Sequence, residues 1–131
     1  MATRASIKFV NKNNQTLVTV YKHHDGYPSG LGQDILNIVS NKPITNGITG
    51  RPSLGESFNG FGCLVASFIS LMKDRVGDIY IEHESHFGDM SEDYLYTIQE
   101  QPDNSVKVFV SSTYDDSLES DLEKLLEQVD N

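Results

Sequence analysis

The sequence is poor in the residue types that build disulfide-linked and thiolate-metal proteins. Among its 131 residues it has one cysteine, Cys63, and no tryptophan. A single cysteine excludes an internal disulfide and any metal site that needs several thiolates. The residues around Cys63 are small or apolar, which predicts a buried and inert side chain rather than a nucleophile.

Long hydrophobic runs are also missing from the sequence. No stretch approaches the roughly 20 apolar residues that cross a bilayer. The polar start, Met1 to Arg4, does not resemble a secretory signal. We therefore expect no membrane partner and a cytoplasmic location.

Basic residues are scarce, since 10 lysines and arginines stand against 19 acids and give a formal charge of −9. We expect no direct nucleic-acid binding, because phosphate backbones attract basic patches. The acidic excess is greatest between residues 115 and 130, where Lys124 is the one basic residue. This run predicts a solvated helix face. Alternatively, it imitates the charge of a nucleic acid and occupies a basic partner surface.

Hydrophobic periodicity predicts one domain over residues 1–131, with alternating apolar residues in strands and helical spacing in amphipathic helices. Gly77 is expected to stop the second helix, and Asp116 or Ser117 to cap the last one. The expected fold class is α+β, with an antiparallel sheet of about five strands and about three helices in the order β-β-α-α-β-β-β-α. The pattern predicts strands at 6–10 and 16–21, a helix at 31–40, a second helix in the stretch 58–73 that residues 75–77 close, strands at 78–83, 94–99 and 105–110, and a last helix from Ser117.

Residues 21–32, where the second strand turns into the first helix, form the most distinctive polar stretch of the chain. Asp25 and Gly26 signal a tight turn, and Pro28 favours an extended Tyr27. We expect the helix cap at Ser29 or Gly30, with free N–H groups that suit a carboxylate or phosphate. A plain sharp turn explains the same residues, and neither a dinucleotide-binding fingerprint nor a phosphate-binding loop is present.

The loop at residues 42–55 holds Arg51, an isolated cation that either binds an anion or carboxylate or is a plain surface arginine. Together with the corner it supplies the candidate ligand-binding residues. These are Tyr21, His23, His24, Asp25, Tyr27, Gly30 and Arg51.

All four histidines fall in two short stretches that also contain acids. If the end of the second strand lies beside the end of the third, His24, His83 and His86 form an alternative metal site. A second alternative is acid–base chemistry with His23 or His24 oriented by Asp25. No pair has the spacing of a helical metal site and no serine lies in a nucleophile elbow. The leading interpretation has no catalytic residue and no cofactor.

The corner pattern, Tyr-x-His-x-Asp-Gly-Tyr-Pro-x-Gly-x-Gly, resembles a group of small, mostly uncharacterised proteins of phages, prophages and some large viruses. The resemblance continues into the helix at 61–72, residues 77–81 and residues 92–98. It implies a viral origin and an accessory role, in the cytoplasm of a host. It transfers no catalytic residue.

These observations favour a non-enzymatic accessory binding protein. We expect it to counter a host defence by binding a small anionic or nucleotide ligand or a host protein. One alternative is a small metal-dependent or acid–base hydrolase that uses His24, Asp25 and His83. A further alternative is a homo-oligomeric structural or assembly protein that associates through an open strand edge or the second helix.

Overall fold

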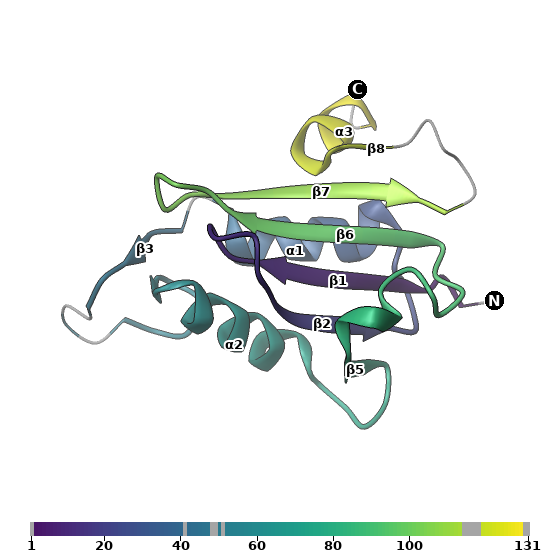
Figure 1. Ribbon diagram of the computed structural model, residues 1–131, viewed down its shortest axis with the longest axis horizontal. Helices are drawn as coiled ribbons and strands as arrows, with labels where there is room; N and C mark the ends of the chain where they lie inside the picture. The colour runs from purple at the N-terminus through teal and green to yellow at the C-terminus, as the bar shows by residue number, and fades with distance from the viewer. Residues whose placement is uncertain (1, 41, 48–49, 51, 114–118, 130–131) are drawn as a thin grey trace.

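The computed structural model describes residues 2–40, 42–47, 50, 52–113 and 119–129. Its main feature is a six-stranded sheet in the order β5-β2-β1-β6-β7-β8, with α1 (Gln33–Val39) behind it (Figure 1). The expected α+β class is confirmed. The strands of this sheet are β1 (Ala5–Val10), β2 (Thr16–Lys22), β5 (Ile79–Glu82), β6 (Tyr94–Glu100), β7 (Val106–Ser112) and β8 (Glu119–Asp121).

The helices and two short strands complete the described chain. A helical turn at Pro28–Gly32 leads into α1 (Gln33–Val39), and α2 spans Phe61–Met72. Two-residue strands β3 (Ile44–Thr45) and β4 (Phe58–Asn59) pair in parallel before α2. The last helix, α3, spans Leu122–Val129, and a short 3-10 turn, η2, spans Glu84–His86.

One strand pair differs from the expected antiparallel pattern. β1 and β6 are parallel, whereas the other pairs in this sheet are antiparallel. β5 therefore runs in the same direction as β6, and the connecting residues 83–93 must return the chain along the sheet. They do so on the face opposite the helices, where Lys8 Nζ lies 4.8 Å from the centroid of the Phe87 ring.

Alternation along the strands places one row of side chains under the helices. Ile7 of β1 has Val20 and Tyr96 as its neighbours across the sheet, and all three are buried. The ring of Phe68 from α2 meets Phe9 edge-on, with centroids 5.3 Å apart. This layer forms the hydrophobic core.

Helix α2 lies in the stretch where a helix was expected, but two details differ. Phe68 and its neighbours one helical turn away face the sheet, so Cys63 projects outward and is exposed, contrary to the expected burial. The helix ends at Met72, before Gly77, because Lys73 already adopts an extended conformation. No helix in the described part of the chain is both long and apolar enough to span a bilayer.

The C-terminal region also differs from expectation. Residues 119–121 pair with β7 as a strand, and the helix begins only at Leu122. Asp121 caps it, since its Oδ1 accepts a hydrogen bond of 3.0 Å from the N–H of Glu123. The expected caps, Asp116 and Ser117, lie outside the described residues.

Candidate functional site

The helix entry at the corner is closed by its own backbone. The helical turn begins at Pro28, earlier than the expected caps at Ser29 and Gly30, and Tyr27 before it is extended. The N–H of Gly30 donates to the carbonyl of Tyr27 at 3.0 Å, and the N–H of Leu31 donates to the carbonyl of Asp25 at 3.1 Å. Two of the backbone N–H groups that were expected to bind an anion are therefore already paired within the turn.

Close packing explains the glycine at position 26. A Cβ there would lie 2.7 Å from the Cβ of Ala5 and 2.9 Å from the carbonyl oxygen of Thr3. The turn is pressed against β1, and the positive φ falls on Asp25, at 58°. The buried hydroxyl of Tyr96 donates to the Gly26 carbonyl at 2.7 Å. Burial raises the pKa of Tyr96, so the hydroxyl remains a donor at every physiological pH.

Gly30 and the aromatic side chains of the corner are packed in a similar way. A Cβ on Gly30 would lie 2.7 Å from Cε2 of Tyr27. The hydroxyl of Tyr21 lies 2.8 Å from Nδ1 of His23, and the rings of His23 and His24 meet edge-on at 4.7 Å. His24 is exposed. Gly26 and Gly30 are thus held by close packing of the turn, and Tyr21 and His23 contact each other.

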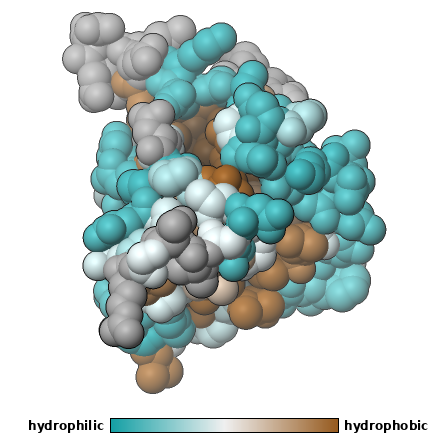
Figure 2. Space-filling model, turned by 90° about the vertical axis from the view of Figure 1, so that its left-hand side faces the viewer, coloured by the Kyte–Doolittle hydropathy of each residue, from teal (hydrophilic) through white to brown (hydrophobic). Residues whose placement is uncertain are grey.

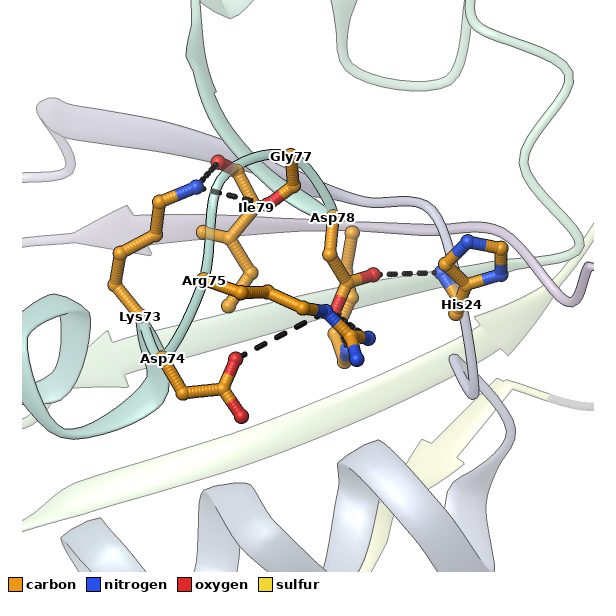
Figure 3. Close-up of polar contacts among 8 residues, drawn as sticks. His24, Lys73, Asp74, Arg75, Gly77, Asp78 and Ile79 are labelled. Carbon is orange, nitrogen blue, oxygen red and sulfur yellow. Dashed lines mark hydrogen bonds and ion pairs between the residues drawn. The ribbon is translucent and has the colours of Figure 1, made fainter.

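A buried carboxylate joins this corner to the start of β5 (Figure 3). Asp78 accepts hydrogen bonds from Lys22 Nζ at 2.6 Å, from Arg75 Nη2 at 3.1 Å and from the backbone N–H of His24 at 2.9 Å. Lys22 is 7% exposed and Asp78 is 9% exposed. Burial opposes ionisation of Asp78, but these hydrogen bonds outweigh it and lower the pKa of the carboxyl.

The backbone that carries Asp78 is tightly turned. Gly77 has φ of 83° and Asp78 has φ of 66°, and the N–H of Ile79 donates to the carbonyl of Gly77 at 2.7 Å. Such a conformation is uncommon for a non-glycine residue. The three hydrogen bonds to its carboxylate hold Asp78 in it and so fix where β5 begins.

The cluster of Asp78, Lys22 and Arg75 is not apparent from the sequence pattern. One signal was present in β2, where Lys22 follows Val18 and Val20 at the core-facing positions of an alternating strand. A charged residue at such a position requires a buried partner of opposite charge. The position of the partner, far along the sequence, could not be obtained from the pattern.

The two pairs of histidines lie at opposite ends of β5. β2 and β5 are antiparallel, so the end of β2 meets the start of β5, with Lys22 opposite Ile79. His24 therefore lies beside Asp78, whereas His83 and His86 follow Glu82, about 10 Å or more along the strand at roughly 3.3 Å per residue. The structure does not assemble the alternative metal site of His24, His83 and His86.

The acids near these histidines have other contacts. Glu82 Oε2 lies 3.0 Å from Nδ1 of His86, and Glu92 accepts the backbone N–H groups of Gly88 and Met90. Within the described residues, no three side chains of metal-ligating type come together. Asp25 is exposed and shows no contact that orients His24 as a base. Arg51, the remaining candidate, lies outside the described residues.

The outer edge of β5 carries exposed apolar side chains. Ile81 is 68% exposed, Tyr80 is 47% exposed, and Leu17 on the neighbouring strand is 45% exposed. A hollow of about 300 Å³ lies where β2 extends beyond the end of β5. Its lining consists of Thr16, Leu17, Val18, Thr19, Ile81, Glu82, His83 and Glu84.

Lysine covers only part of that edge. Lys73 Nζ donates to the carbonyls of Gly77 at 2.8 Å and Ile79 at 2.9 Å (Figure 3). Lysine at an edge is a common protection against unwanted strand pairing. Here it protects the start of β5, and Ile81 further along is uncovered among the described residues.

A second hollow, of about 420 Å³, lies between α2 and residues 45–59. Its lining includes Thr45, Ser57, Asn59 and the exposed Cys63. The side of the molecule that carries β3 shows brown hydrophobic patches between hydrophilic surface (Figure 2). Among the described residues, the side chains that line this second hollow are uncharged.

Comparisons with known proteins identify no relative: no family model, curated protein or solved structure matches this chain.

Proposed function

We propose that this chain is a non-enzymatic accessory binding protein, of viral or phage origin, that recognises an extended segment of a protein partner at the β5 edge. Its setting is the cytoplasm of a host cell, and its role there is to counter a defence. The origin and role follow from the resemblance of the corner pattern, and the mode of binding from the β5 edge.

The observation that supports protein binding is the end of the sheet at β5. In the described chain no further strand pairs with the outer side of β5, and Ile81 exposes two thirds of its surface there. An extended peptide binds an open edge by adding a strand. Here the N–H and C=O of Ile81 offer the pairing groups, because those of Ile79 are bonded to Gly77 and Lys73. Exposed apolar side chains beside the edge supply pockets for the side chains of the partner.

The alternatives receive less support from the geometry. A small anionic ligand needs free donors, but the N–H groups of Gly30 and Leu31 are paired within the turn. A metal-dependent hydrolase needs His24 beside His83, and β5 separates them. Homo-oligomerisation through a strand edge is compatible with the same surface.

The test is affinity capture from host lysate with three tagged proteins: wild type, Ile81→Lys and Phe109→Lys. Phe109 is the matched control, since it is a partly exposed apolar residue on β7 of the same sheet. We expect wild type and Phe109→Lys to retain the same host proteins and Ile81→Lys to lose them. Retention of the same proteins by Ile81→Lys would contradict the proposal.

A further inference from the structure

We infer that the extended segment that fits the β5 edge is β5 of a second copy of this chain, paired antiparallel about a two-fold axis near Ile81. The inference rests on the proposed function, because it names a partner for the same edge. A host segment that binds there must then compete with this self-pairing.

The hydrogen bonds of β5 show which groups face outward. The N–H of His23 donates to the carbonyl of Asp78 at 2.8 Å. Because bonded and non-bonded pairs alternate along antiparallel strands, Tyr80 and Glu82 direct their backbone groups toward β2. Ile79 and Ile81 direct theirs outward, which agrees with the bond from Lys73 Nζ to the Ile79 carbonyl.

Ile81 is the natural centre of a symmetric pairing. With the two-fold axis at this residue, the N–H of each Ile81 donates to the carbonyl of Ile81 in the second copy. Each Ile79 then lies opposite His83 of the second copy. The pairing leaves the bonds between β5 and β2 intact and continues the sheet from one copy into the other.

In this orientation, opposite charges of the two copies face each other beside β5. Residues 73–78 carry two cations, Lys73 and Arg75, and two acids, Asp74 and Asp78, whereas the end of β5 carries the acids Glu82 and Glu84. Lys73 Nζ lies at the carbonyls of Gly77 and Ile79. Antiparallel pairing about Ile81 places these residues opposite residues 83–85 of the second copy, so that Lys73 lies closest to its Glu84. Parallel pairing would instead place Lys73 against Lys73.

Arg75 and Glu82 have partners within the chain, in Asp78 and His86 respectively. Lys73 forms its hydrogen bonds only with carbonyl oxygens among the described residues, and Glu84 is exposed. Lys73 and Glu84 are therefore the pair whose charges remain available to a second copy.

The apolar side chains favour the same arrangement. Ile81 is exposed on the face of the sheet that carries Val20, and the two-fold axis brings the two copies of Ile81 together there. The exposed Tyr80 lies on the other face, since neighbouring residues of a strand point to opposite faces. Burial of this apolar surface stabilises the pair. Stable dimers bury about 800 Å² per subunit, and β5 has only four residues, so we expect a weak dimer that dissociates on dilution.

The first measurement is sedimentation equilibrium of the full chain from about 1 µM to about 500 µM. We expect wild type and Phe109→Lys to pass from monomer to dimer over this range, and Ile81→Lys to stay monomeric. A wild type that is monomeric throughout, or an Ile81→Lys variant that still dimerises, would overturn the inference.

Charge reversal then tests the orientation. Lys73→Glu and Glu84→Lys each turn two attractive pairs into two repulsive ones, so we expect each to raise the dimer Kd about tenfold. The double variant, Lys73→Glu with Glu84→Lys, restores opposite charges across the axis and should recover most of the loss. Both single variants and the double variant lie at exposed positions, and thermal melts confirm that they are folded.

The double variant also controls for the hydrogen bonds of Lys73 within its own chain. Those bonds to Gly77 and Ile79 are lost equally in Lys73→Glu and in the double variant. Recovery therefore reports the contact between copies, and a double variant no better than the single variants would overturn the antiparallel arrangement.

Failure of the inference is distinguishable from failure of the proposed function. A monomeric wild type whose captured host proteins depend on Ile81 would overturn the self-pairing and leave the β5 edge as a binding surface. A dimer that depends on Ile81, with host capture that does not, would support the self-pairing and contradict capture of host proteins at this edge.

Discussion

Replacement of Asp78 by asparagine tests the buried ion pair that fixes the start of β5. Asparagine preserves the volume but leaves the Lys22 ammonium, which is buried, without a carboxylate. Breaking a buried pair by removing one charge destabilises a protein by about 3–5 kcal/mol. For a domain of this size that corresponds to a fall in Tm of roughly 10–20 °C.

Thermal and urea unfolding at pH 7, followed by circular dichroism, would measure this effect. Asp74→Asn is the matched control, because Asp74 is exposed and its carboxylate lies as far as 4.0 Å from Arg75. We therefore expect the free energy of unfolding to change by less than about 0.5 kcal/mol. The double variant, Lys22→Met with Asp78→Asn, removes both charges and should be more stable than Asp78→Asn alone. An Asp78→Asn protein within about 1 kcal/mol of wild type would refute the reasoning.

The effect of Asp78→Asn on the free energy of unfolding should depend on pH in a defined direction. The pKa of Asp78 in the folded protein is lowered from 3.8, so the unfolded chain takes up the proton first as the pH falls. The stabilisation is complete above the ordinary pKa and is lost as the pH falls through the lowered value. Urea unfolding at pH 7 and at acid pH should show the difference between wild type and Asp78→Asn shrinking below about pH 4.

Three further substitutions, with Gly62→Ala as a control, test the packing of the corner and the start of the last helix by urea unfolding. Gly26→Ala places a methyl group 2.7 Å from a neighbouring Cβ and should destabilise the protein by about 1–3 kcal/mol. Gly62→Ala, whose methyl group meets open space in α2, should not destabilise it. Equal effects of the two substitutions would contradict the packing explanation. Tyr96→Phe leaves the Gly26 carbonyl without its donor and should destabilise by about 1–3 kcal/mol. Asp121→Ala removes the cap of α3 and should destabilise by about 0.5–2 kcal/mol; no change would place the helix start elsewhere.

Local patterns predicted the elements of this fold well. Alternation of apolar residues identified β1, β2, β6 and β7, because one face of each strand lies in the core. The helical stripe identified α2 to within its ends. The parallel pairing of β1 and β6 joins segments far apart in the chain, and no local pattern encodes it.

The candidate site was less predictable than the fold. The polar residues of the corner indicated a ligand site, whereas the need for glycine at positions 26 and 30 comes from close contacts that only the folded chain reveals. Asp78 was read as the first residue of a strand, because the buried partner that lowers its pKa comes from β2. The exposed edge at Ile81 could not be predicted, because local patterns do not show which strand lies at the end of the sheet.

Hydrogen–deuterium exchange of the backbone amides of β5, at single-residue resolution, tests most directly whether this edge is the binding surface. In dilute protein we expect the outward Ile81 amide to exchange rapidly, while Tyr80 and Glu82, which are paired with β2, remain protected. In concentrated protein or with a captured partner bound, the Ile81 amide should gain protection. An Ile81 amide whose exchange is unchanged under both conditions would contradict binding at the β5 edge.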